Sequence, residues 1–169
     1  MSPQAPLDAL VGRLAAALVA RRATIVAAES CTGGLIAAAC TARPGSSAWF
    51  ERGVVTYSNA AKSDLLGVPA ALIEAHGAVS AEVARAMAEG ALARSPAHYA
   101  VAVTGIAGPD GGTPAKPVGT VWIATCARAG GATEAVLLQA RGDRAAVRAQ
   151  SVALALELML ARIEAAPAC

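Results

Sequence analysis

The sequence is poor in aromatic and charged residues and lacks any long apolar run. Two Trp, two Tyr and one Phe occur among 169 residues, too few for the stacking platforms that bind single-stranded nucleic acids. Lys and Arg are scattered along the chain and the formal net charge is +2, which argues against nucleic acid as a partner. No apolar stretch is long enough to cross a bilayer, so we expect no membrane partner.

Paired metal-binding motifs are also missing. The sequence contains four cysteines, Cys31, Cys40, Cys126 and Cys169. None of them forms a CxxC pair, and neither His76 nor His98 stands at ligand spacing from another His or Cys, so we expect no metal site. The chain does not open with a basic segment followed by an apolar run, as a secretory signal would. We therefore expect a cytoplasmic protein with free thiols.

Helical and strand patterns alternate along most of the chain. The expected helices are 7–22, a small-residue helix ending near Thr41, short helices after Ser58 and after Pro69, 81–94, and a long helix from Asp143 to about Glu164. The expected strands are 24–28, 49–57, 98–104, 118–126 and 133–139. This order predicts a single α/β/α layered domain with a mixed, mostly parallel sheet, a core of about 8–164 and a frayed tail at 165–169. It does not give the strand order.

The first candidate site is the segment Glu29 to Gly34, where a predicted strand turns into a helix. Backbone N–H groups at a helix start lack partners within the helix, so they can bind a phosphate or an oxyanion. Gly33 and Gly34 would let a ligand approach the backbone closely. The alternative is a simple capping residue with a packed glycine pair.

The second candidate is Lys62, near the start of a short helix that Ser58 or Asn59 can cap. A cation there faces the positive end of the helix dipole. As a general base near neutral pH it needs a pKa about three units below its usual value, which requires burial or a neighbouring cation. A surface lysine is the alternative. Neither histidine lies near a Ser in an elbow motif, so a Ser–Lys pair is a better prediction than a Ser–His–Asp triad.

Two further candidates lie in the second half of the chain. The loop 105–117 contains four glycines and three prolines and matches neither the P-loop nor the dinucleotide fingerprint. Thr104 and Gly105 end the preceding strand, where α/β proteins usually bind ligands. Arg144 follows Asp143 at a helix start, which suits an arginine that faces an anion. A purely structural loop and a solvated arginine remain the alternatives.

Six segments together resemble the CinA C-terminal domain family, which includes nicotinamide-nucleotide amidases, over about residues 8–160. They are AESCTGG (28–34), PGSSAWFERGVVTYSNAAKSDLLGV (44–68), HGAVS (76–80), TGIAGPDGG (104–112), KPVGTV (116–121) and GDRAAVR (142–148). Each segment alone is modest, but six in the same order are specific. The sequence starts close to the first expected helix, 7–22, so it resembles the stand-alone form of the domain.

The resemblance implies hydrolysis of nicotinamide mononucleotide to nicotinic acid mononucleotide and ammonia, without a metal or organic cofactor. By position it implies Ser30 as nucleophile, with Lys62 and Tyr57 as proton-transfer partners. The substrate-binding residues expected in this sequence are Thr32, Gly33, Gly34, Thr104, Gly105, Gly108, Lys116 and Arg144. A non-catalytic mononucleotide-binding module and an amidase for another amide are the alternatives. The Ala-rich helices further suggest a homo-oligomer.

Overall fold

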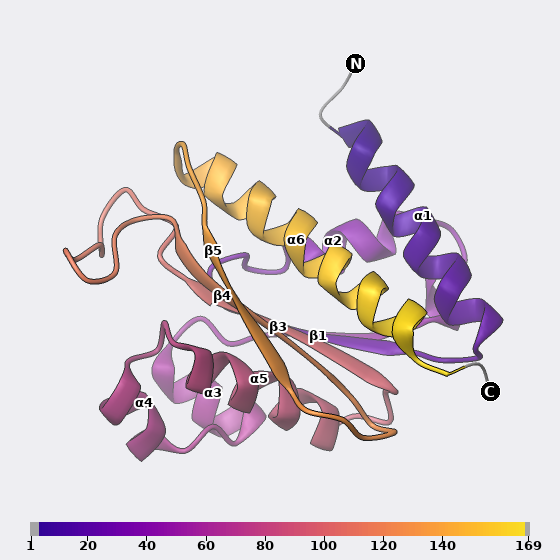
Figure 1. Cartoon of the computed structure of the whole chain (residues 1–169), viewed down its shortest axis with the longest axis horizontal. Helices are drawn as coiled ribbons and strands as arrows, with labels where there is room; N and C mark the ends of the chain where they lie inside the picture. Colours follow the sequence, from indigo (N-terminus) through magenta and orange to yellow (C-terminus); the bar gives the residue numbers. More distant parts are fainter. Residues whose placement is uncertain (1–3, 168–169) are drawn as a thin grey trace.

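A computed structural model describes residues 4–167 (Figure 1). The helices are α1 (Gln4–Ala20), α2 (Leu35–Thr41), α3 (Asn59–Leu66), α4 (Ala70–His76), α5 (Ala81–Ala93) and α6 (Arg144–Ala165). The strands are β1 (Ile25–Glu29), β2 (Phe50–Val55), β3 (Tyr99–Gly105), β4 (Thr120–Ala127) and β5 (Glu134–Gln139). A 3₁₀ turn, Ser46–Ala48, precedes β2.

The strands form one mixed sheet in the order β2-β1-β3-β4-β5. β1 pairs in parallel with β2 and with β3, whereas β4 pairs antiparallel with β3 and with β5. β5 therefore runs in the same direction as β1, β2 and β3. All five residues of β1 are buried, as expected for a central strand covered on both faces.

Helices cover both faces of this sheet (Figure 1). α1, α2 and α6 lie on one face and enclose a core that includes Leu14, Ile36 and Met159. α3, α4 and α5 lie on the other face, over a second core that includes Leu66 and Met87. Successive residues of β1 contribute to the two cores in turn, because their side chains point to opposite faces of the sheet. Ala27 belongs to the first core and Val26 to the second. The expected α/β/α fold with a mixed sheet is confirmed.

The predicted helix boundaries follow the capping residues closely. Ser58, Ser80 and Asp143 each accept a hydrogen bond from a backbone N–H three residues further on. Gly67 ends α3 in a left-handed conformation that favours glycine, and Gly77 ends α4. α6 continues to Ala165, whereas residues 168–169 of the expected frayed tail lie outside the described part of the chain.

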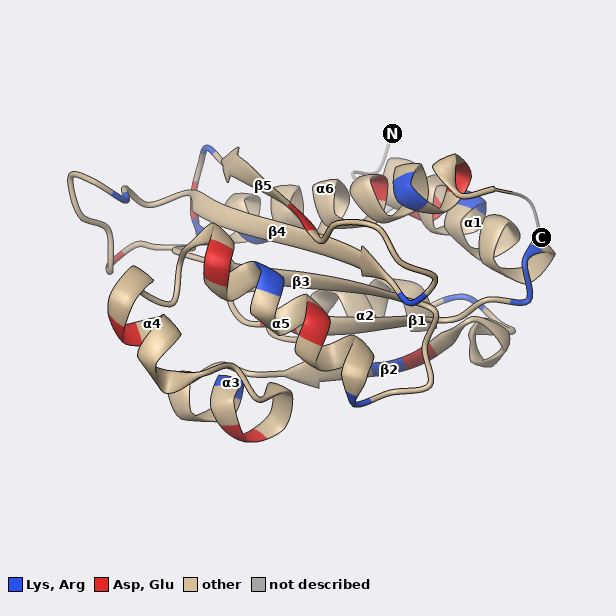
Figure 2. Ribbon diagram, turned by 60° about the horizontal axis from the view of Figure 1, so that its bottom comes forward, with Lys and Arg blue, Asp and Glu red and all other residues tan. Residues whose placement is uncertain are grey.

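Figure 2 shows the charged residues spread over several helices and loops rather than gathered in one part of the molecule. Within residues 4–167, no helix combines the length and the apolar character that a membrane span requires. Cys31, Cys40 and Cys126 are buried free thiols, and Cys169 lies outside the described residues.

Candidate active site

The candidate site lies where β1, β2 and β3 end. The last residue of β1, Glu29, is paired with Val55 of β2 and Val103 of β3. Because these strands are parallel, the residues that follow them emerge at one edge of the sheet. Ser30, Thr56 and Thr104 each stand one position beyond one of these paired residues. Segments 26 to 74 positions apart in the sequence thus meet at a single edge.

Ser30 and Lys62 are in direct contact. The Nζ atom of Lys62 lies 3.1 Å from the Oγ atom of Ser30 and donates to the carbonyl oxygen of Thr56 at 3.0 Å. Lys62 is 1% exposed and Ser30 is 8% exposed. The backbone of Ser30 is fixed as well, because its N–H donates to the carbonyl oxygen of Val103. The alternative of a surface lysine is therefore wrong, and the side chains of Ser30 and Lys62 lie together as a pair.

The surroundings of Lys62 favour its neutral form. Burial lowers the pKa of the Lys62 amine below its usual value of 10.5, and the nearby Cys31 acts in the opposite direction. Both groups that contact its nitrogen, the Ser30 hydroxyl and the Thr56 carbonyl, are uncharged. An amine that has lost its proton can accept the proton of a serine hydroxyl, as a general base must.

The start of α2 differs from the sequence-based expectation. Glu29 is 0% exposed, and its carboxylate accepts the N–H groups of Gly34, Ile36 and Ala37 at 3.1, 3.0 and 2.9 Å. These donors are therefore occupied and cannot bind substrate. The expectation of free N–H groups fails here, because the carboxylate side chain that ends β1 reaches forward onto the helix that follows.

The turn between Ser30 and Gly34 keeps two donors available. The N–H of Gly33 donates to the carbonyl oxygen of Ser30. Within residues 4–167, the N–H groups of Cys31 and Thr32 donate to no oxygen atom. Gly33 has φ +57°, in the left-handed region that favours glycine. The two available N–H groups follow Ser30 directly, where an oxyanion on a Ser30 adduct would form.

The thiol of Cys31 lies beside the candidate nucleophile but is not activated. Its side chain is buried, and burial raises the pKa of the thiol to about 11, although Arg148, Lys62 and Arg144 act in the opposite direction. A thiol with this pKa carries almost no thiolate at neutral pH, and the thiolate is the reactive form.

Tyr57 and Arg144 are in direct contact with each other. Tyr57 is 63% exposed, and its hydroxyl accepts a hydrogen bond from Nη2 of Arg144 at 2.9 Å. The Nη1 atom of Arg144 donates to the carbonyl oxygen of Gly108 at 2.9 Å. Arg144 thus joins the segment after β2 to the loop 105–117. Within the described residues, Tyr57 forms no hydrogen bond with Ser30 or Lys62.

Two of the other expected substrate-binding residues, Thr104 and Lys116, donate to backbone carbonyl oxygens in this structure. The Thr104 hydroxyl is buried and donates to the carbonyl oxygen of Ala78, and Lys116 Nζ donates to that of His76. Thr32 is buried, and its hydroxyl oxygen has no partner within residues 4–167. Gly105 has no room for a side chain, since a Cβ atom there would lie 2.6 Å from Val121.

The sequence analysis gives no individual role to three contributors to the site. Glu29 caps α2, Thr56 supplies a carbonyl acceptor to Lys62, and Arg148 donates to the carbonyl oxygen of Thr32 at 2.9 Å. Glu29 and Arg148 belong to segments already singled out. Arg148 follows Arg144 by four positions on α6, a spacing that places both on one helix face and could have indicated it.

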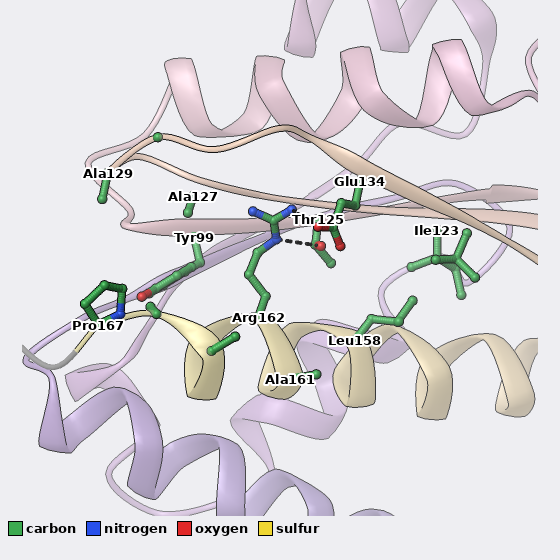
Figure 3. Close-up of a pocket in the computed structure, with 14 residues that line it drawn as sticks. Tyr99, Ile123, Thr125, Ala127, Ala129, Glu134, Leu158, Ala161, Arg162 and Pro167 are labelled. Atoms are coloured by element: carbon green, nitrogen blue, oxygen red, sulfur yellow. Dashed lines mark hydrogen bonds and ion pairs between the residues drawn. The ribbon is translucent and has the colours of Figure 1, made fainter.

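Two hollows in the molecule lie away from this site. A groove of about 610 Å³ runs between α1, α2 and α6. A cavity of about 510 Å³ lies between the sheet and α6, at the end of the sheet where β3 begins (Figure 3). There Arg162 donates to Thr125 and to the carbonyl oxygen of Ala132, and lies 3.6 Å from Glu134. Neither hollow is lined by Ser30 or Lys62.

Comparison with known proteins gives consistent results. The family model described as the CinA C-terminal domain matches residues 7–163. The chain is 55% identical over 158 residues to the nicotinamide-nucleotide amidohydrolase PncC of Pseudomonas putida, covering 92% of this chain and 96% of that protein. It is 54% identical over 144 residues to the protein of the same name from Escherichia coli, covering 85% and 86%. The crystal structure of the competence/damage inducible protein CihA from Agrobacterium tumefaciens matches with a TM-score of 0.89 and 46% identity, over 92% of this chain and 94% of that one.

Proposed function

Because this chain belongs to the CinA C-terminal domain family, we propose that it is a nicotinamide-nucleotide amidohydrolase. The reaction is hydrolysis of the carboxamide of nicotinamide mononucleotide to nicotinic acid mononucleotide and ammonia. The two amidohydrolases at 54–55% identity support the substrate. The observation that carries the chemistry is the buried Lys62 nitrogen 3.1 Å from the Ser30 hydroxyl.

The first step is attack by Ser30. Neutral Lys62 takes the hydroxyl proton of Ser30, and the Ser30 oxygen forms a bond to the carboxamide carbon of the substrate. The lowered pKa of Lys62 supports this role, because an amine near its usual pKa would already be protonated at neutral pH. The Thr56 carbonyl holds the lysine nitrogen in place and stabilises the ammonium that forms.

The negative charge of the tetrahedral intermediate then needs hydrogen-bond donors. We assign this role to the N–H groups of Cys31 and Thr32, which directly follow the nucleophile and have no other oxygen acceptor within residues 4–167. Removal of one such donor typically lowers the rate by two to three orders of magnitude. The N–H groups of α2 itself cannot serve, because Glu29 holds them.

The remaining steps release ammonia and restore the enzyme. The carbon–nitrogen bond breaks, and the leaving amino group takes the proton held by Lys62 to become ammonia, so Lys62 is neutral again. Lys62 then takes a proton from water, and the hydroxide adds to the acyl carbon of the Ser30 ester. The bond from that carbon to the Ser30 oxygen breaks, Ser30 regains the proton from Lys62, and nicotinic acid mononucleotide leaves. Tyr57 is the second proton-transfer group in this proposal. Its hydroxyl becomes available when the substrate phosphate draws Arg144 away from it.

Arg144 is the proposed phosphate ligand. Arg144 is an exposed residue, and its guanidinium contacts two uncharged oxygens, those of Tyr57 and Gly108. A phosphate is a stronger acceptor for a guanidinium than either of them. Lys116 and the glycine N–H groups of the loop 105–117 remain secondary candidates for the same phosphate.

The direct test is a steady-state assay of ammonia release by purified protein, with nicotinic acid mononucleotide identified as the second product. Nicotinamide riboside and free nicotinamide serve as substrates that lack the phosphate. Turnover of the mononucleotide with the highest kcat/KM supports the proposal. Binding without turnover would indicate a mononucleotide-binding module, and faster turnover of a phosphate-free amide would indicate a different amidase.

A further inference from the structure

The turn that carries Ser30 is held from two sides by charged side chains that have no role in the steps above. Glu29 lies immediately before Ser30 and is completely buried. Its carboxylate forms three hydrogen bonds, all with N–H groups at the start of α2. Arg148 approaches the same turn from α6 and donates to the carbonyl oxygen of Thr32.

The contacts of Arg148 fix one particular peptide group. The carbonyl oxygen of Thr32 and the N–H of Gly33 belong to the same planar unit. The carbonyl is held by Arg148, and the N–H donates to the carbonyl oxygen of Ser30. Rotation of this unit would break both bonds together. The Ser30 carbonyl that accepts from Gly33 shares its peptide unit with the N–H of Cys31, so the same hydrogen bond also fixes the direction of that N–H.

The contacts of Glu29 fix the other side of the turn. With the N–H groups of Gly34, Ile36 and Ala37 occupied by the carboxylate, Cys31 and Thr32 are the two residues of the segment 30–37 whose backbone N–H has no oxygen acceptor within the described residues. No cation within residues 4–167 forms a salt bridge with Glu29. Such a buried carboxylate is costly unless hydrogen bonds satisfy it. Here the carboxylate is satisfied by three backbone N–H groups at the start of α2.

We propose that Glu29 and Arg148 are positioning residues that hold the Ser30 turn in the geometry needed to bind the oxyanion. The inference rests on the proposed amidohydrolase function. Neither residue touches the reacting atoms in this scheme. Both act through the backbone of residues 30–34. They should therefore affect kcat rather than KM.

The test variants are Glu29→Gln and Arg148→Met. Glutamine has nearly the same shape as glutamate, but its NH₂ group cannot accept a hydrogen bond from an N–H group. Arg148→Met retains the aliphatic stem and removes the donor. A displacement of the turn by about 1 Å should lower kcat by about 100-fold, with KM changed by less than about threefold. Arg148→Lys keeps a donor and should recover part of the activity.

The matched control is Arg128→Met. Arg128 also donates to backbone carbonyl oxygens, those of Leu92, Ser95 and Ala97, but these lie at the other end of β3. Its loss should lower the unfolding temperature and leave kcat per folded molecule unchanged. A purely structural role for Glu29 and Arg148 predicts the same behaviour in their variants.

A second readout does not depend on the substrate. A fluorophosphonate probe labels an activated serine and places an oxygen where the oxyanion forms, so its reaction rate with Ser30 reports the geometry of the turn. We expect labelling of folded Glu29→Gln and Arg148→Met to be at least tenfold slower than in wild type. If the wild type is labelled but releases no ammonia, the proposed substrate is wrong and the labelling rates still decide the positioning role. Unchanged labelling and kcat in both folded variants, or a wild-type Ser30 that is not labelled, would overturn the inference.

Discussion

The side-chain nitrogen of Lys62 lies 3.1 Å from the hydroxyl oxygen of Ser30, 32 residues earlier in the chain. Both side chains are buried, and the other acceptor at the lysine nitrogen is the uncharged carbonyl of Thr56. Burial lowers the pKa of this amine. A lysine so placed is poorly suited to a purely structural role, because a buried cation without a carboxylate partner reduces stability.

The first prediction concerns the pH dependence of activity. Since the neutral form of Lys62 is the proposed base, kcat/KM should rise with pH and level off once Lys62 has lost its proton in the free enzyme. The midpoint should lie below 10.5 because burial lowers the Lys62 pKa. Lys62→Arg, which stays protonated, should lose at least 100-fold in kcat at every pH. A pH–rate profile of both proteins checks this, and an active arginine variant would exclude the lysine as base.

The second prediction concerns stability. The Lys62 pKa is lower in the folded protein than in the unfolded chain, so unfolding takes up a proton between the two values, and the free energy of unfolding rises with pH in that window. Relative to Lys62→Met, the wild type should gain stability as pH rises toward 10, by at most about 1.4 kcal/mol per pH unit. Urea unfolding of both proteins at several pH values measures the difference. A difference that does not change with pH would contradict the lowered pKa.

The third prediction concerns Cys31. Because burial raises the pKa of its thiol to about 11, Cys31→Ala should keep kcat within a few-fold of wild type. Iodoacetamide should inactivate the wild-type enzyme very slowly near pH 7, and faster only at much higher pH. Loss of turnover in Cys31→Ala with normal unfolding would instead make the thiol the nucleophile.

The fourth prediction separates the roles of Arg144 and Tyr57. Arg144→Met should raise KM for nicotinamide mononucleotide about 10- to 100-fold, the effect of one lost charge-assisted hydrogen bond. The same variant should leave kcat/KM for nicotinamide riboside nearly unchanged, since that substrate has no phosphate. Equal losses on both substrates would show that Arg144 does not bind the phosphate.

Tyr57→Phe removes the hydroxyl that accepts from Arg144 but keeps the ring. As a proton-transfer group, Tyr57 should contribute mainly to kcat, and its loss should lower kcat at least tenfold with little change in KM. A rise in KM alone would mean that the hydroxyl only orients Arg144.

Much of the fold follows from local sequence signals. Ser58, Ser80 and Asp143 mark helix starts through their own side-chain hydrogen bonds, and Gly67 and Gly77 mark helix ends. Such signals act within four residues, so they can be identified without tertiary structure. The strand order could not be predicted, because β1 pairs with β2 and β3 from segments up to 74 residues apart.

The site was predictable only in part, because it too depends on contacts between segments far apart in the sequence. Ser30 and Lys62 stand out through motif and helix position, but the burial that lowers the Lys62 pKa depends on the packing of α3 against α4 and α5 after folding. The roles of Glu29 and Arg148 depend on where their side chains reach after folding. Glu29 bends forward onto α2, and Arg148 crosses from α6 to a turn 116 residues earlier.

The central claim is that Ser30 is the nucleophile of an amidase. The most direct measurement is ammonia release from nicotinamide mononucleotide by the wild type and by Ser30→Ala, with matched unfolding curves to show that both are folded. The account predicts ammonia and nicotinic acid mononucleotide from the wild type, and a fall of at least 1000-fold in kcat for the alanine variant. Turnover by Ser30→Ala at the wild-type rate would contradict the account.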